Sequence, residues 1–275
     1  MRGPEADAAL DTRRSAPYSF GMAPSVDDIL SELSWGRGYF PEEALRAALE
    51  CGEQIVPHLI AAVERAAKEP DDLPDTYVLH VCALFLLAEM RERRAYRPIV
   101  ELCRLTDDRL YDLISDVPTE GLPQILASVA QEDDSLLREL VEDEANSPAV
   151  RVAALHAMAC CAVERVIDRD RFVGYLADLL RGNLLPMRRS VVLDEAACIA
   201  ADLGLEQCLT ESLRAFDAGL IRGMVISRQE IVDARDRAVA PFVPSGPERY
   251  GFVTSAVEEL WPWRSMWVAQ RSSPS

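Results

Sequence analysis

The chain has little lysine, little histidine and few aromatic residues. Lys68 is its single lysine, it has three histidines, and aromatic residues make up 7% of the sequence. It has seven cysteines, but no two form a C-x-x-C pair, and the histidines are not spaced from them as zinc ligands would be. Most cysteines fall in apolar helical patterns, where a free thiol behaves as a small hydrophobe. We therefore predict no metal site and no cofactor.

Long apolar segments are also scarce, and basic residues are fewer than acidic ones. The longest apolar run, residues 77–90, contains His80 and Glu89 and is too short to cross a bilayer. The N-terminal stretch lacks the apolar core of a signal peptide. We expect a cytoplasmic protein with no membrane contact. The net charge of −17 would repel phosphate backbones, which disfavours nucleic acid as a partner.

Motifs of the common catalytic and nucleotide-binding sites are missing. The sequence contains no GxSxG, HExxH, P-loop or GxGxxG pattern. We predict no catalytic residue from local motifs, and an enzyme is the less favoured class of protein.

Helical patterns, in contrast, run through most of the chain. "SVDDILSEL" opens with Ser25 as an expected N-cap and Asp28 three residues later. In "FPEEALRAALECG", Pro41 is expected at the first helical position and Gly52 just past the end. "YVLHVCALFLLAEM" is apolar on nearly every face, which is typical of a helix buried between layers.

Helix pairs recur along the sequence. The expected inner helices begin near Tyr77, Pro118, Pro148 and Met187, at separations of 41, 30 and 39 residues. No alternating pattern long enough for a sheet occurs. We predict an all-α protein, an α-solenoid of stacked helical hairpins of the HEAT/ARM type. Its parts are a disordered tail (1–24), the solenoid (25–240), and a linker with a Trp-rich C-terminal cap segment (241–275).

The stretch "SDVPTEGLPQILAS" carries Asp116, Thr119 and Glu120. Pro118 suits a first helical turn, where acidic side chains accept backbone N–H groups and meet the positive end of the helix dipole. We favour this capping role. A buried structural network and acid–base catalysis are the alternatives, but no His, Lys or Tyr lies nearby in the sequence to support catalysis.

Two further clusters are candidate partner-binding residues. Arginines at two expected turns could line one edge of the stack and bind an anionic group; their alternative role is ion pairing with the many acids. Three tryptophans near the C-terminus could anchor an interface or close the open end of the last repeat. The residues are Arg91, Arg94, Arg97, Arg188, Arg189, Trp261, Trp263 and Trp267.

Several segments together resemble DUF1186, a bacterial family of unknown function. They include "FPEEALRAALECGEQIVPHLIAAVERA", "YVLHVCALFLLAEMRERRAYRPIVELCRL", "SDVPTEGLPQILASVA" and "VEELWPWRSM", in the family's order, over roughly residues 26–267. The resemblance implies a HEAT-type helical protein without established catalytic residues. Many members add a Cys-rich, zinc-binding SEC-C segment; this chain has no cysteine after Cys208, so we expect no such contact.

The sequence thus predicts a non-enzymatic helical-repeat scaffold that binds a protein or peptide. The alternative is an enzyme or small-ligand binder with a concave-face site using Asp116, Glu120 and nearby arginines. Nucleic-acid binding would require the candidate arginines to form one continuous basic groove.

Overall fold

A computed structural model describes residues 24–36, 38–115, 117–237, 241–242 and 250–268. Within these ranges the chain is built from helices and contains no β-strand, so the predicted all-α class is confirmed. An isolated β-bridge joins Trp35 and Tyr77. Residues 1–23 of the predicted tail lie outside the described ranges, and the predicted linker is described only at Pro241 and Phe242.

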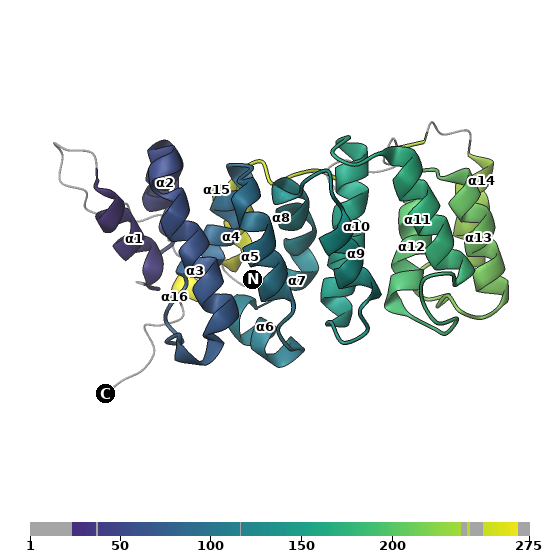
Figure 1. Ribbon diagram of the computed structural model, residues 1–275, viewed down its shortest axis with the longest axis horizontal. Coiled ribbons are helices and arrows are strands. Elements are labelled where there is room, and N and C mark those ends of the chain that lie inside the picture. The colour runs from purple at the N-terminus through teal and green to yellow at the C-terminus, as the bar shows by residue number, and fades with distance from the viewer. Residues whose placement is uncertain (1–23, 37, 116, 238–240, 243–249, 269–275) are drawn as a thin grey trace, which may run out of the picture.

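The helices follow one another through short connections (Figure 1). The first half contains α1 (Val26–Ser34), α2 (Glu42–Cys51), α3 (Val56–Lys68), α4 (Leu79–Glu89), α5 (Tyr96–Cys103), α6 (Asp107–Ile114), α7 (Val117–Glu120) and α8 (Leu122–Val129). The second half contains α9 (Ser135–Glu142), α10 (Pro148–Val163), α11 (Arg169–Arg181), α12 (Val191–Asp202), α13 (Glu206–Asp217), α14 (Arg228–Asp236), α15 (Ala256–Leu260) and α16 (Ser265–Val268). The short 3-10 helices are η1 (Gly52–Gln54), η2 (Pro70–Asp72), η3 (Arg93–Ala95) and η4 (Trp261–Trp263).

Most of these helices lie in two rows, which give the molecule its elongated shape in Figure 1. In the inner row α4 packs against α8, α8 against α10, and α10 against α12. The outer row consists of α3, α5, α9, α11 and α13, each of which contacts a helix of the inner row. Any surface formed between inner helices is therefore built from helices that are not consecutive in the sequence.

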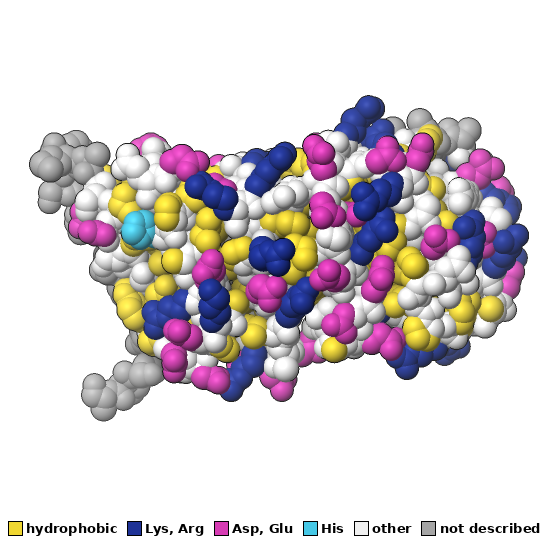
Figure 2. Space-filling view, in the orientation of Figure 1, with side chains coloured by type: hydrophobic (Ala, Val, Ile, Leu, Met, Phe, Trp, Pro, Cys, Tyr) yellow, Lys and Arg dark blue, Asp and Glu magenta, His cyan; other side chains and the backbone are white. Residues whose placement is uncertain are grey.

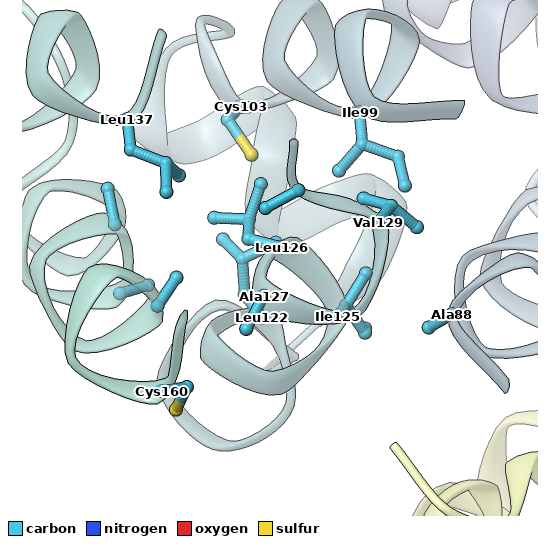
Figure 3. Close-up of a cluster of buried hydrophobic side chains, with 14 of the residues drawn as sticks. Ala88, Ile99, Cys103, Leu122, Ile125, Leu126, Ala127, Val129, Leu137 and Cys160 are labelled. Carbon is cyan, nitrogen blue, oxygen red and sulfur yellow. The ribbon is translucent and has the colours of Figure 1, made fainter. Parts of the chain in front are cut away.

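The helices of the inner row are buried on several sides because their residues are apolar on most faces. Every residue of α4 from Leu79 to Ala88 is buried, as its all-round apolar pattern predicts. Around α8, side chains from four other helices close the core, as Figure 3 shows. They are Ala88 of α4, Ile99 and Cys103 of α5, Leu137 of α9 and Cys160 of α10.

The polar surface carries both signs of charge. On the face seen in Figure 2, basic and acidic side chains are interspersed along the whole length of the molecule. Several are paired between neighbouring outer helices; Arg104, just after α5, for example lies 2.7 Å from Glu139 of α9. Exposed pairs of this kind contribute at most about 1 kcal/mol each.

Three inner helices end in the same way. Arg91 after α4, Arg165 after α10 and Gly204 after α12 have φ of 55°, 62° and 63°. In each case the next residue donates its backbone N–H to a carbonyl five residues earlier, as in a Schellman turn. The left-handed conformation costs a non-glycine residue about 1 kcal/mol or more. Arg91 offsets part of this cost, because its Nη1 donates to the Ala88 carbonyl.

Helix boundaries follow the predicted caps with three differences. Pro41, predicted at the first helical position, is instead the residue before α2, which begins at Glu42. Ser25 and Asp28 form the expected capping box. The helix expected near Met187 begins instead at Val191, where the Ser190 hydroxyl accepts the backbone N–H of Val192. The helix expected from Pro118 is divided into α7 and α8. Pro123 causes the break, because it has no N–H to continue the α7 ladder.

The C-terminal segment, residues 250–268, crosses the inner row; we call it the strap. Its residues 251–254 are non-helical, and the backbone N–H of Val253 donates to Ser128 Oγ at 2.9 Å. The backbone N–H of Ala256 then donates to Glu89 Oε2 at 2.6 Å, and α15 packs against α2 and α4. The Trp-rich segment therefore lies in the N-terminal half, and not at the end formed by α13 and α14 where the sequence pattern had placed a cap.

An ion-pair cluster joins the ends of two outer helices. Glu211 of α13 is buried and accepts hydrogen bonds from Arg181 of α11 and from Arg214. Burial alone would raise the pKa of Glu211, but the two guanidinium groups outweigh it and hold the pKa below its usual value. The cluster therefore stabilises the fold when Glu211 is ionised.

Replacing Glu211 by Gln is expected to lower the free energy of unfolding at pH 7 by about 1 to 3 kcal/mol. Because the folded-state pKa is depressed, this contribution exists above the unfolded-state pKa and disappears as the pH falls through the folded-state pKa. Urea titrations of both proteins at pH 7 and pH 3 check this. The control Glu101→Gln, at an exposed position of α5, is expected to change little at either pH. A difference for Glu211→Gln that does not shrink as the pH is lowered from 7 would contradict the ionic explanation.

Candidate functional site

A hollow of about 400 Å³ opens where α7, α8, α10 and α12 meet, and we call it the central hollow. It joins three helices of the inner row, so its walls come from three stretches of sequence. Its lining residues are Glu120, Pro123, Gln124, Pro148, Ala149, Val152, Ala153, His156, Val191 and Glu195.

Helical periodicity puts these side chains on one surface. Pro148, Val152 and His156 follow each other at intervals of four along α10, and Val191 and Glu195 do so along α12. Because α10 and α12 pack side by side, the two stripes face the same space. The result is a hollow with an apolar wall and polar groups at its edge.

The polar edge is organised by His156. Its Nδ1 lies 3.1 Å from Glu195 Oε1, and both side chains are largely buried, with 9% and 13% exposed. The ring of Tyr250, from the strap, stacks on the imidazole at 4.6 Å with an interplanar angle of 13°. The Tyr250 hydroxyl donates to Asp202 Oδ2 of α12 at 2.9 Å. The strap therefore fixes the orientation of one wall of the hollow.

Two further polar groups reach the hollow. Glu120, the last residue of α7, is exposed and has no ion-pair partner among the described residues. The Oε1 atom of Gln124 is buried and accepts no hydrogen bond within the described part of the chain. Among the described residues that line the hollow there is no lysine or arginine. The described part of the hollow thus combines two glutamates and a histidine with an apolar wall.

Of the predicted Asp116–Thr119–Glu120 group, the structure describes the side chain of Glu120. Asp116 lies outside the described residues, and Thr119 is placed in α7 without a description of its side chain. Glu120 lines the central hollow, where it shares the space with His156 and Glu195. Its neighbours at the site are thus residues that the local sequence pattern did not connect with it.

The candidate arginines do not line the central hollow, and most have partners inside the protein. Arg91 donates to Ser128 Oγ at 2.7 Å and lies over the ring of Phe252. Arg94 pairs with Glu53 and Glu92, Arg188 pairs with Glu144, and Arg189 donates to the Gly219 carbonyl. Arg97 is exposed on α5. The contacts of Arg94 and Arg188 fit the ion-pairing alternative.

Two of the three candidate tryptophans are buried. Trp267 is fully buried, and Trp263 is 9% exposed and packs on Phe85 of α4. Trp261 is half-buried, contacts Phe40, and has the Arg264 guanidinium over its ring. In this conformation a partner could reach only part of Trp261, so the cluster serves mainly to attach the strap.

A second hollow, of about 470 Å³, lies at the turn between α10 and α11. Three arginines line it, together with Glu132 and Asp168. Two of them have internal partners: Arg169 donates to the carbonyls of Ala162 and Val163, and Arg171 pairs with the buried Asp134. This hollow combines opposite charges and belongs to the ion pairing between helix pairs.

The sequence pattern missed His156 and Glu195. The spacing of the histidines from the cysteines carries no information on this pair, because His156 contacts a carboxylate 39 residues away. That separation falls within the 30- to 41-residue spacing of the expected inner helices. Comparing residues one repeat apart on neighbouring inner helices would have been the signal for this pair.

The described residues contain neither a cluster of metal ligands nor a membrane-spanning helix. They contain no group of three or more His, Cys, Asp or Glu side chains arranged to hold a metal ion. None of their helices is long and apolar enough to cross a membrane.

Together these features define an all-helical protein whose paired helices surround a mixed apolar and acidic hollow. Residues 24–266 match the family described as protein of unknown function (DUF1186), and the chain belongs to that family. It is 32% identical over 208 residues to an uncharacterized protein of Chlamydia muridarum, covering 75% of this chain and 83% of the relative. It is 31% identical over 212 residues to one of Chlamydia trachomatis serovar D, covering 76% and 84%. No solved structure matches the chain.

Proposed function

We propose that the chain is an α-solenoid of HEAT-like helix pairs that acts as a non-enzymatic scaffold and binds a protein or peptide partner. The two rows of stacked helices support this proposal, because such rows present a long surface made of successive repeats. The net charge of −17 favours a partner with basic segments.

The observation that carries the proposal is the strap. Over residues 251–254 the inner row already holds a non-helical segment of polypeptide. It does so through side chains of Ser128 and Glu89, which accept main-chain N–H groups, and through stacking of Tyr250 on His156. Main-chain hydrogen bonds combined with aromatic anchors are a usual means of recognising extended peptides. His156, on which Tyr250 stacks, also lines the central hollow, so the hollow adjoins this segment.

Site-specific photo-crosslinking in the native host tests the scaffold function. A photoreactive amino acid replaces Val152, in the wall of the central hollow, and in a second strain replaces Glu101, exposed on α5 of the outer row. We expect the first position to crosslink one or a few defined proteins that the second does not capture. Equal capture at both positions, or none at Val152, would contradict docking at the inner row.

A second function remains supported by one contact. His156 and Glu195 form a histidine–carboxylate pair, and Glu120 lines the same hollow, so a small-ligand or acid–base site is the alternative. The arginines invoked for this alternative do not contribute to the hollow. Thermal-shift screening of small metabolites against the wild-type protein and Glu195→Gln distinguishes the two functions. A small molecule that stabilises only the wild-type protein would favour the alternative.

A further inference from the structure

We propose that a surface made by two successive connections binds an acidic, leucine-rich segment of a partner protein. The connections are residues 182–190, between α11 and α12, and residues 218–227, between α13 and α14; we call this surface the loop edge. In Figure 1 both lie at the lower edge of the molecule, beneath α11 and α13. The loop edge shares no residue with the central hollow or the strap, so the inference goes beyond docking at the inner row.

Exposed apolar side chains are concentrated at the loop edge. Met224 is 90% exposed, and three further large apolar side chains of the two connections are exposed: those of Leu184, Met187 and Val225. Within the described residues, the other exposed large apolar side chains are Trp35 and Tyr111, which belong to other parts of the fold. Single exposed apolar side chains are normal on a folded protein, whereas a group of them marks an interaction surface.

The two connections are held in place by hydrogen bonds, so these side chains are presented on a fixed backbone. Arg189 Nε donates to the Gly219 carbonyl at 2.9 Å, which joins one connection to the other. Arg222 donates to the buried carboxylate of Asp194 in α12, through its backbone N–H at 2.8 Å and through its Nε at 2.5 Å. A surface that is formed before binding loses less conformational entropy when a partner docks.

The local charge indicates an acidic partner segment. The two connections contain three arginines and no acidic residue, although acidic residues outnumber basic ones by 46 to 29 in the whole chain. Arg188 and Arg222 pair with carboxylates of the protein, whereas Arg189 has no carboxylate partner among the described residues. The lower right of Figure 2 shows hydrophobic side chains beside basic ones. Because a guanidinium has five N–H donors, all three arginines retain donors for a carboxylate of a partner.

The combination of residues favours a protein segment over a lipid surface. Juxtamembrane segments that bind anionic lipids carry about four to eight basic residues. The loop edge has three arginines, and the net charge of −17 would repel an anionic bilayer. Leucines of an acidic segment can instead cover Met187 and Met224, whose unbranched side chains adapt to different apolar surfaces, while its carboxylates contact the arginines.

Nuclear magnetic resonance of the full chain with isotope-labelled methionine methyl groups tests the assignment. Met187 and Met224 report on the loop edge, and Met158, fully buried in α10, is an internal control. The probe is the peptide acetyl-EELLEELLEELL-amide. Its controls are acetyl-KKLLKKLLKKLL-amide, with reversed charge, and acetyl-EEAAEEAAEEAA-amide, with less apolar surface. We expect the acidic leucine peptide to shift the two loop-edge signals saturably, and both controls to do so with roughly tenfold weaker affinity.

Matched variants link the signal to the residues. Met224→Gln and Arg189→Gln each change an exposed side chain, so both are expected to fold normally. Each should weaken binding of the acidic leucine peptide by roughly fivefold to tenfold, with Met187 as the reporter. Tyr111→Ala, at an exposed aromatic residue of α6, and Arg97→Gln, at an exposed arginine of α5, are expected to bind as the wild-type protein does.

Several results would overturn the proposal. They are the absence of a saturable shift, equal affinity for the control peptides, and unchanged affinity of both loop-edge variants. Shifts of the Met187 and Met224 signals with vesicles of phosphatidylglycerol and phosphatidylcholine, but not with the peptide, would assign the loop edge to a lipid surface. Shifts on concentrating the protein alone would assign it to a second copy of the chain. Photo-crosslinking at Val152 concerns the inner row, so its failure would leave the loop edge unaffected.

Discussion

Replacing Trp267 by alanine is expected to lower the free energy of unfolding by about 3 to 5 kcal/mol. Trp267 is fully buried in α16, and its ring packs edge-on against Phe40 at 5.5 Å. Its carbonyl also accepts the backbone N–H of Gly38 at 2.7 Å. The side chain thus attaches the end of the strap to the first helices, and its removal leaves a large cavity between segments far apart in sequence.

Urea unfolding followed by far-ultraviolet circular dichroism measures this loss. Tyr111→Ala is the matched control, because Tyr111 is aromatic but 60% exposed, and its loss should stay within about 0.5 kcal/mol. If Trp267→Ala lost no more than this control, the strap would not belong to the cooperative folding unit.

Replacing Ser128 by alanine is the second large effect, an expected loss of about 1 to 3 kcal/mol. Its hydroxyl accepts from Arg91 Nη1 and from the backbone N–H of Val253, and it donates to the Gln124 carbonyl. Ser128 therefore joins α4, α8 and the strap through one oxygen. Without it the buried N–H of Val253 has no acceptor, and the cost is that of an unsatisfied donor.

Ser212→Ala separates this effect from the loss of any buried serine. Ser212 is also buried, and within the described part of the chain its hydroxyl makes one bond, to the carbonyl of Cys208 four residues earlier. Such local bonds contribute little to helix stability, so we expect a loss of at most about 0.5 kcal/mol. Hydrogen exchange gives a second readout: the Val253 amide should exchange faster in Ser128→Ala and be unchanged in Ser212→Ala. Unchanged exchange in both variants would contradict the role assigned to Ser128.

The local parts of the fold could be predicted from the sequence. Ser25 and Asp28 form the predicted capping box, and α4 is buried on all faces because its pattern is apolar on all faces. These features depend on residues within one or two helical turns, which a linear pattern records directly. The class of fold follows from them, since helices of this kind must bury their apolar faces against one another.

The position of the strap could not be predicted in this way. Val253 bonds to Ser128 across 125 residues, and Ala256 bonds to Glu89 across 167 residues. Periodicity shows that a tryptophan-rich segment needs a buried place, but it does not say which of several apolar surfaces provides that place. The buried positions of Trp263 and Trp267 are the outcome of that long-range choice.

The candidate site shows the same limit. The sequence groups Glu120 with neighbouring Asp116 and Thr119, whereas its companions in the hollow come from α8, α10 and α12. The arginines were chosen as a possible docking edge, yet Arg91 is used to hold a turn and the strap. A local charge pattern identifies ionisable residues but not the neighbours that determine their use.

The strap also has a consequence for biosynthesis. The N–H donors of Val253 and Ala256 follow their acceptors, Ser128 and Glu89, by 125 and 167 residues, so they are translated well after them. Until these donors are made, the surface of α2 and α4 on which α15 packs in the folded protein lacks this contact. Transiently exposed apolar surface of this kind is prone to aggregation, so we expect it to be a site of chaperone contact during synthesis.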